Sequence, residues 1–403
     1  MHRSLLRYVV CPFCESELRV VGSSSDPVES GELHCSTGHS FPIILGVPHL
    51  LRDRLDEVTR RTAENFGDQW TRFDEHYDAH RQQFLDWIAP LGPEHFEGKI
   101  TVELGCGMGR HGALAGEFGA EAHLAVDVSD AVFVAQRLAA KNPRVHVIRA
   151  DLFQLPLRGI ADLAFSVGVL HHTADPHSAF QALLGCVKPG GAFAAWVYGR
   201  ENNGWIVHLV DPIRKVITSR LPSGALYRLS QLLSWAVVIP VVKLLFRPLA
   251  RIMPSLARRL PYGQYLSYVG QFPARQIHGI VHDHLSAPVA HYLRRAEVKR
   301  WLEEADAEKP VLRHHNGMSW LVAGRLPGRA LESNRENLGP GCAHLPEPRE
   351  RNVISIVHVP SGPLQVPRRN LVDLLETARV RPFRTSMRHG AGADRLDDEV
   401  RRV

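Results

Sequence analysis

Cysteine is scarce in this sequence, with six residues among 403, and three of the six stand within the first 35 positions. A small disulfide-stapled scaffold needs a denser framework of cysteines, so that class of protein is excluded. Gathered cysteines indicate metal binding, or incidental use in a reducing compartment. We therefore expect a cytoplasmic protein.

A strong charge excess is also lacking. The formal net charge is +6, and 44% of the residues are hydrophobic against 22% charged, as in ordinary soluble globular proteins. This balance does not by itself indicate a nucleic-acid-binding protein. The opening stretch MHRSLLRYVVCPFC has an apolar run too short for a secretory signal, so we expect none. A chain of this length is expected to form two or three units.

Residues 1–51 predict a small metal-binding unit. Cys11 and Cys14 have C-x2-C spacing, and Cys35 is followed four residues later by His39. Three thiolates and one imidazole in two short knuckles are typical of a tetrahedral structural zinc site. His34 is an alternative fourth ligand, but its place next to Cys35 makes chelation by both residues awkward. A hairpin whose cysteines bind nothing is the other alternative.

The phrase GHSFPIILGVPHLL, residues 38–51, follows the second knuckle. Together with CPFC it resembles the Trm112-like zinc-binding domain, in which a similar phrase commonly follows the second knuckle. Many members of that family carry a fourth cysteine where this chain has His39. A unit of about fifty residues has little core of its own, so zinc would support its folding rather than perform chemistry.

Residues 52–98 predict helices. Phe66, Trp70 and Phe73 recur at three- and four-residue intervals, and the phrase APLGP ends the pattern. A helix pair that covers the next unit and a lid over a ligand pocket both fit this spacing.

From residue 99 to residue 200 the sequence alternates strand-like and helix-like segments. This repetition predicts a parallel sheet with helices on both faces. Ligands of such sheets bind at the carboxyl ends of the strands. The expected strands are KITVEL, AHLAVDVS, VHVIRAD, ADLAFSVGVL and GAFAAWVY.

The stretch VELGCGMGRHG, residues 102–112, places four glycines directly behind the first expected strand. Glycine at this density indicates a tight turn or a ligand against the main chain. Gly107, Gly109 and Gly112 match the dinucleotide spacing G-x-G-x-x-G, and Asp127 stands where a ribose-binding acid is expected. A nicotinamide dinucleotide, as in a dehydrogenase, is therefore one candidate ligand.

Gly105, Gly107 and Gly109 equally match the E-x-G-x-G-x-G turn of S-adenosylmethionine enzymes, with Glu103 as the acid. A pyrophosphate gains nothing from an anionic side chain at this strand end, whereas a cationic sulfonium ligand with an amino group does. The phrases RAD, FSVGVLHHTADP and VKPGG follow at the carboxyl ends of later strands or just before the fifth strand. The glycines alone do not distinguish a dinucleotide from S-adenosylmethionine, and these later phrases favour S-adenosylmethionine.

Together these motifs resemble the class I S-adenosylmethionine-dependent methyltransferases, closely over residues 99–200 and again over 296–326. The resemblance implies an α/β fold with a Rossmann-like parallel sheet, closed by an antiparallel hairpin whose tight turn is Asn316-Gly317. A zinc ribbon would precede this core, and a helical insertion, residues 201–295, would interrupt it. The implied activity is methyl transfer from S-adenosyl-L-methionine.

The resemblance also implies a role for each residue that matches the family's motifs. The three glycines would let the backbone approach the cofactor, Glu103 would lie near its ammonium group, and Asp127 would accept hydrogen bonds from both ribose hydroxyls. Asp151 would accept from the adenine amino group, with a helix N-cap as its alternative role. The expected cofactor-binding residues are Glu103, Gly105, Cys106, Gly107, Gly109, Asp127, Asp151 and Val167.

Two histidines follow the fourth strand, where the transferred methyl group is expected. His171 is the candidate catalytic residue, since the ordinary pKa of histidine allows it to take a proton from the acceptor near neutral pH. Alternatively, His171 and His172 only order the loop, because methyl transfer can proceed through positioning without an essential base. The N-P-P-Y signature of DNA and protein amide methylation is lacking here, which argues against such targets.

The insertion is basic, with nine Lys or Arg against two Asp or Glu in residues 201–260. Its apolar run within 231–260 contains Pro240 and Lys243, so we expect it to be too broken to span a bilayer. The run predicts a helical cap over the acceptor pocket or a peripheral element that lies on anionic lipid, and we expect the cap.

Residues 327–403 are polar and rich in proline and glycine, and most of this tail is expected to be flexible. Three functions remain open for the whole chain. The first is methyl transfer to a small-molecule or lipid-type acceptor, which we favour. The second is RNA methylation with the ribbon as a docking module, although the ribbon lacks interleaved basic and aromatic residues. The third, a non-enzymatic partner protein, conflicts with complete cofactor motifs.

Overall fold

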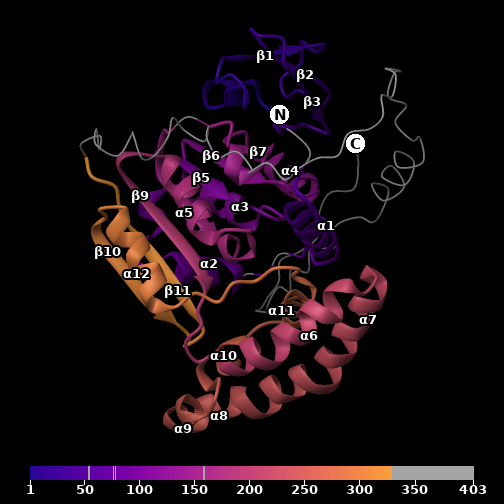
Figure 1. Ribbon diagram of the computed structural model, residues 1–403, viewed down its shortest axis with the longest axis vertical. Helices are drawn as coiled ribbons and strands as arrows, with labels where there is room; N and C mark the ends of the chain where they lie inside the picture. Colours follow the sequence, from indigo (N-terminus) through magenta and orange to yellow (C-terminus); the bar gives the residue numbers. More distant parts are fainter. Residues whose placement is uncertain (53–54, 76, 78, 158, 329–403) are drawn as a thin grey trace, which may run out of the picture. The chain divides into compact units, whose positions relative to one another are not determined.

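The computed structural model describes residues 1–328 apart from 53–54, 76, 78 and 158 (Figure 1). The expectation for the tail, residues 327–403, lies almost wholly outside this part of the chain. The main sheet has seven strands in the order β10-β11-β9-β8-β5-β6-β7. Their bounds are β5 Ile100–Leu104, β6 Ala122–Asp127, β7 Val145–Arg149, β8 Ala161–Val167, β9 Val187–Tyr198, β10 Glu308–His315 and β11 Ser319–Arg325.

Strands β5 to β9 are parallel, and β10 and β11 add an antiparallel hairpin beside β9. The central strands are buried on both faces, which explains their almost continuous apolar sequence. The hairpin turns at Asn316 and Gly317, whose φ angles of 51° and 69° lie in the left-handed region that these residue types tolerate. The expected α/β fold with a terminal antiparallel hairpin is confirmed.

Helices cover both faces of this sheet (Figure 1). Helix α1 begins where Asp56 accepts hydrogen bonds from the backbone N–H groups of Val58 and Thr59, and α5 begins with the Asp175 cap and Pro176 in its first turn. The helices outside the insertion are α1 Glu57–Arg72, α2 Ala79–Ile88, α3 Arg110–Glu117, α4 Val132–Ala139, α5 Pro176–Gly185 and α12 Arg295–Glu304.

A small antiparallel sheet precedes this core, with strands in the order β1-β2-β3-β4. Two backbone hydrogen bonds join it to the core: Val10 N–H donates to the Pro156 carbonyl at 2.9 Å, and Leu50 N–H donates to the Arg149 carbonyl at 2.8 Å. The strand bounds are β1 Leu18–Val21, β2 Gly31–Cys35, β3 Ser40–Ile44 and β4 Val47–Pro48.

The insertion between β9 and α12 is helical. Its α-helices are α6 Asp211–Val216, α7 Ser223–Leu233, α8 Arg247–Ile252, α9 Pro254–Arg259, α10 Gly263–Val269 and α11 Ala274–Ser286, and its π-helical turns are η5 Ile206–Val210, η7 Ser234–Val238 and η8 Val241–Phe246.

Segments α7, η7, η8 and α8 form one helical run, Ser223–Ile252, which we call the long helix. Pro240 lies inside it without ending it, so the expectation of a broken run is wrong. By length and composition the long helix could cross a membrane, a test that the core helix of a soluble protein also passes.

Candidate active site

A cavity of about 290 Å³ lies at the carboxyl ends of the parallel strands. Its sheet side is formed by the turns that follow β5, β6, β7 and β8. Helix α1 contributes Phe66 and Trp70, and the insertion contributes side chains of α10 and α11 such as Tyr265 and Asp283. The structure therefore surrounds one cavity with the cofactor motifs, the helix pair and the insertion.

The glycine turn after β5 takes its shape from backbone strain and close packing. Gly105, Gly107 and Gly109 all have φ between 51° and 82°, a region that disfavours side chains. A Cβ at Gly105 would meet Val169 at 2.3 Å, and one at Gly109 would meet Ala135 at 2.7 Å. Gly105 and Gly107 line the cavity together with Cys106, whereas Gly109 instead packs against α4.

Asp127 lies at the end of β6 and faces this turn. Its Oδ2 accepts a hydrogen bond from Gly107 N–H at 2.8 Å, and its Oδ1 accepts from Ser129 N–H and Oγ–H at 2.8 and 2.7 Å. Burial raises the pKa of the carboxyl against the effect of these hydrogen bonds. The side chain lines the cavity, where its further lone pairs can accept hydroxyl groups.

Asp151 and Val167 line the same cavity from the ends of β7 and β8. Asp151 Oδ1 accepts a hydrogen bond from Phe153 N–H at 2.9 Å and caps a short 3-10 turn, η3 Leu152–Gln154, which was its alternative role. A carboxylate has more lone pairs than this cap uses, so capping leaves it able to accept from a ligand amino group.

Glu103 is placed differently from the sequence expectation. Its carboxylate is 1% exposed, is not part of the cavity wall, and lies between His111 and His123 at 2.7 and 3.5 Å. These histidines hold the pKa of Glu103 at about 2 in spite of burial. Direct contact with the cofactor's ammonium group is thus not supported, because the side chain is buried between two histidines and does not line the cavity.

Arg110, which the sequence reasoning missed, connects this buried group to the cavity. Its Nε donates to His111 Nε2 at 3.2 Å, and His111 Nδ1 donates to Glu103. The guanidinium lies 5.3 and 5.5 Å from the ring centres of Trp70 and Trp87, at distances that allow cation–π attraction. A cation on the cavity wall among aromatic rings suits a carboxylate ligand. The sequence signal that could have identified Arg110 is its position directly after Gly109, the third glycine of the turn.

The two histidines after β8 have different surroundings. His172 lines the cavity, and its Nδ1 donates to the Val289 carbonyl at 2.6 Å. His171 is fully buried behind the wall, and neither ring nitrogen has a hydrogen-bond partner among the described residues. Burial lowers the pKa of His171 well below its ordinary value. The catalytic role of His171 stays a prediction, and the geometry gives His172 the position nearer a ligand.

A second feature missed from the sequence is a tyrosine–carboxylate pair at the acceptor side. Tyr198 Oη, at the end of β9, donates to Asp283 Oδ2 of α11 at 2.8 Å, and Gln69 Nε2 of α1 lies 3.4 Å from the other oxygen. Both Tyr198 and Asp283 line the cavity beside His172. Tyr198 could have been identified from the sequence, because it ends an expected strand and such strand ends border the ligand site. No sequence pattern indicates that Asp283 lies opposite it.

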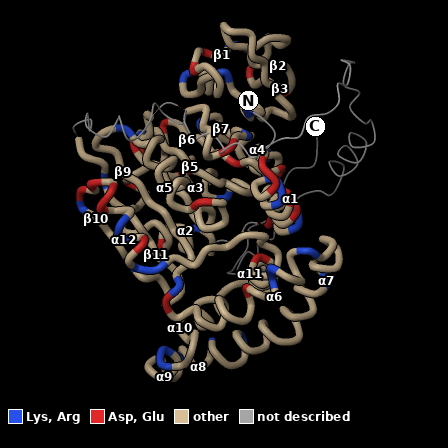
Figure 2. Tube along the Cα trace, in the orientation of Figure 1, with Lys and Arg blue, Asp and Glu red and all other residues tan. Residues whose placement is uncertain are grey.

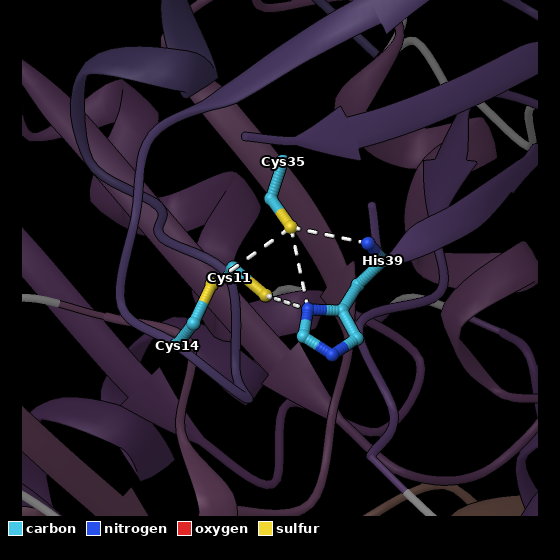
Figure 3. A group of neighbouring side chains, drawn as sticks. All are labelled: Cys11, Cys14, Cys35 and His39. Atoms are coloured by element: carbon cyan, nitrogen blue, oxygen red, sulfur yellow. Dashed lines mark hydrogen bonds between the residues drawn. The ribbon is translucent and has the colours of Figure 1, made fainter. Parts of the chain in front are cut away.

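The four expected metal ligands also come together (Figure 3). The ligand atoms of Cys11, Cys14, Cys35 and His39 all lie within 4.8 Å of one another. Sγ of Cys14 lies 3.8 Å from Sγ of Cys35, and His39 Nδ1 lies 3.6 Å from Sγ of Cys11. His34 points elsewhere, with its Nε2 2.5 Å from Glu32. The geometry therefore favours His39 over His34.

The role of Glu103 gives a test of stability. Glu103→Gln should lower the free energy of unfolding by about 1–3 kcal/mol at pH 7, since it removes a buried charged acceptor. The pKa is depressed in the folded state, so this contribution should be complete above about pH 5 and disappear as the pH falls towards 2. Urea unfolding at several pH values measures it.

Glu64→Gln is the matched control, because Glu64 forms an exposed pair with Arg60 and should change stability by less than about 0.5 kcal/mol. A Glu103→Gln variant with full stability and weakened cofactor binding would instead support the direct contact expected from the sequence.

Comparison with known proteins agrees with this geometry. Residues 102–195 match the family model described as a methyltransferase domain. A tRNA U34 carboxymethyltransferase of Geobacter sp. strain M21 is 32% identical over 114 residues, which cover 27% of this chain and 34% of that protein. The chain thus spans about a third of the length of this relative. An uncharacterized methyltransferase of Mycobacterium bovis is 27% identical over 47% of this chain and 92% of its own length.

Among solved structures, an S-adenosylmethionine-dependent methyltransferase from Mesorhizobium loti has a TM-score of 0.35 at 18% identity, covering 63% of this chain and 99% of that chain. Magnesium protoporphyrin IX methyltransferase from Synechocystis has a TM-score of 0.38 at 13% identity, covering 67% and 98%. The matched domain model and the sheet order lead to one assignment. This chain contains a methyltransferase domain of the class I S-adenosylmethionine-dependent type.

Proposed function

We propose that this chain is an enzyme that transfers the methyl group of S-adenosyl-L-methionine to a small-molecule or lipid-type acceptor. The observation that carries the proposal is the composition of the cavity at the carboxyl ends of the parallel strands. Asp127 and Asp151 line its sheet side, while Phe66, Val269 and Phe272 are among the apolar side chains that line it from α1 and the insertion. Apolar walls with a few placed polar groups are typical of small-molecule sites.

The donor set fits S-adenosylmethionine, which supplies an electrophilic methyl group on a sulfonium. Asp127 would accept the ribose hydroxyls, Asp151 would accept the adenine amino group, and Val167 would contact the cofactor at the end of β8. Arg110 would bind the methionine carboxylate, since its guanidinium borders the cavity. These residues hold and orient the donor, so that desolvation and alignment supply much of the rate.

The acceptor would lie on the insertion side, where α11 contributes the carboxylate of Asp283 to the cavity wall. Tyr198 and Gln69 hold its two oxygens, so the side chain is fixed between β9 and α1. A carboxylate fixed in this way can accept the proton of an acceptor hydroxyl or amine as the methyl group is transferred. We propose Asp283 as the group that orients and deprotonates the acceptor.

RNA methylation is the second candidate, because the curated relatives in this comparison include tRNA U34 carboxymethyltransferases. The matches cover 27% and 24% of this chain, so they bear on a part of it alone. The net charge of +6 is small for a protein that neutralises many phosphates. We therefore propose RNA as a less favoured acceptor than an apolar small molecule or lipid.

We also propose that Cys11, Cys14, Cys35 and His39 bind one structural zinc ion. A tetrahedral zinc site with bonds of about 2.3 Å to sulfur and about 2.0 Å to nitrogen separates its ligand atoms by about 3.5–3.8 Å. Three of the observed separations, 3.3, 3.6 and 3.8 Å, lie in or near that range, and all four ligand atoms lie within 4.8 Å of one another.

The first test of the proposed function is cofactor binding. Asp127→Ala should weaken S-adenosylmethionine binding by about 1–3 kcal/mol, because the ribose hydroxyls and Gly107 N–H lose their acceptor. Asp130→Ala, which removes a nearby exposed carboxylate outside the cavity wall, should bind as the wild type does. Calorimetry measures both, and equal affinities would remove Asp127 from the site.

The identity of the acceptor is tested in cells that produce either the wild type or Asp127→Ala. Lipids, metabolites and bulk RNA from cells with the wild type and with Asp127→Ala are compared for mass increases of one methylene. An apolar product is the expected result, and a product found in RNA alone would replace the proposal with its alternative.

A second prediction concerns Asp283. Asp283→Asn should lower kcat about 100-fold or more, the contribution typical of a general base, with cofactor affinity within about twofold of the wild type. Transfer of labelled methyl groups into an extract of the identified acceptor class measures the rate. Tyr198→Phe is the control: it keeps the carboxylate of Asp283, so its kcat should fall less. An unchanged kcat in Asp283→Asn would exclude Asp283 as the general base.

Zinc gives a third prediction. Freshly purified protein should contain about one zinc per chain, Cys35→Ser and His39→Ala should lose it, and Cys186→Ser and His34→Ala should keep it. Metal analysis by mass spectrometry measures the content. Wild-type protein without zinc would contradict the site. If His39→Ala kept its zinc and His34→Ala lost it, the fourth ligand would be His34 instead of His39.

A further inference from the structure

Exposed apolar side chains are concentrated in one part of the insertion. Of the twenty large hydrophobic residues that are exposed in the described chain, fifteen lie between Trp205 and Leu256. Ile252 and Leu244 are 78% and 77% exposed, and Trp235 is 56% exposed. We call these fifteen side chains the apolar face. Single exposed hydrophobics are ordinary, but this concentration indicates a surface that another apolar phase covers.

The exposed charge around the apolar face is mostly basic, since Asp211, which lies within its span, is buried and paired with Arg214 and Lys215. No Asp or Glu occurs between Asp211 and Asp283, whereas ten Lys or Arg do. Six of these cations are exposed: Lys215, Arg220, Arg228, Arg251, Arg258 and Arg259. Figure 2 shows the long helix mostly without charge and a basic group at α9, the segment that follows it. The surface is therefore complementary to an anionic partner.

The long helix has one packed side. Leu226, Ser230, Ser234, Val242 and Phe246 are buried at intervals of four or eight residues. An α-helix of 3.6 residues per turn would rotate such a stripe around its axis, and the wider π turns η7 and η8 counter that drift. The packed side therefore stays on one face, which leaves the opposite face to the exposed apolar side chains.

These two sides decide how the helix meets lipid. Val242 packs against Val269, Phe272 and Ile277 in one buried cluster, so lipid cannot surround the helix as it would a spanning segment. A helix that is packed on one side and apolar on the other fits the headgroup–acyl boundary. A second copy of the chain would bring like charges together, which disfavours self-association.

We propose that the apolar face docks the protein on the surface of a bilayer that contains anionic lipid. The exposed apolar side chains enter the acyl boundary, and Arg251, Arg258 and Arg259 lie among the anionic headgroups. The docking face is close to the cavity: Val269 and Phe272 line the cavity and belong to the cluster that packs on the long helix. The long helix and this one buried cluster therefore lie between the bilayer and the acceptor side.

The test is co-sedimentation of the full chain with vesicles of phosphatidylcholine, with and without phosphatidylglycerol. The wild type should bind the anionic vesicles and bind the neutral ones much more weakly. Arg251→Gln/Arg258→Gln/Arg259→Gln should weaken binding about 100-fold, as expected for three cations near an anionic surface. Trp235→Ser/Leu244→Ser should weaken it about tenfold or more through lost apolar burial.

Matched controls remove the same groups elsewhere. Ile44→Ser/Leu45→Ser deletes two exposed apolar side chains of the ribbon, and Arg19→Gln/Arg144→Gln/Arg300→Gln deletes three exposed cations outside the insertion. Both controls should bind vesicles within about twofold of the wild type.

Three results would overturn the proposal: wild-type protein that ignores anionic vesicles, controls that lose binding as much as the test variants, or a dimer without lipid that Trp235→Ser/Leu244→Ser dissociates. Analytical ultracentrifugation measures the last. The assay needs no turnover, so its failure is distinguishable from failure of the methyltransferase proposal.

Discussion

Parallel alignment of β5 to β9 is the constraint on which the site depends. It brings the carboxyl ends of five strands to one edge of the sheet, although those ends are spread over nearly a hundred residues of sequence. The turn after β5, Asp127 at the end of β6 and Asp151 after β7 become neighbours for this reason. The hydrogen bond from Gly107 to Asp127 then joins the first two strand ends, so the turn and the acid share one geometry.

Much of this was predictable, because the signals are local. Buried strands have apolar sequences, glycines mark the turn, and an acid that directly follows a strand lies at the edge where ligands bind. Asp127 and Asp151 line the cavity as such an argument requires. Glu103 does not, because its role depends on His111 and His123, which become its neighbours only when α3 and β6 pack against β5. The position of Glu103 in the sequence predicts that it lies on β5, but it does not predict which side chains surround it.

The insertion was less predictable for a related reason. Pro240 suggested an interruption, since proline removes a donor and crowds the preceding turn. It stands between η7 and η8, where wider turns change the local hydrogen bonding and the run continues. The place of Asp283 opposite Tyr198 depends on how α11 returns to the sheet, 85 residues after the end of β9. No local pattern carries a contact of that span, so the acceptor side emerged only from the structure.

The two sides of the insertion have a common physical consequence. Each methylene that leaves a bilayer for water costs about 0.8 kcal/mol, so an acceptor with ten buried methylenes would face a barrier of about 8 kcal/mol on its way to a soluble enzyme. If the long helix docks on a bilayer, a cavity directly behind it would shorten that path through water. The same helices that carry Asp283 towards β9 pack against the long helix, so acceptor orientation and membrane contact rest on one packed unit. On the proposals above, the apolar cavity wall and the exposed apolar face would serve one lipid-type acceptor from two sides of the same packed unit.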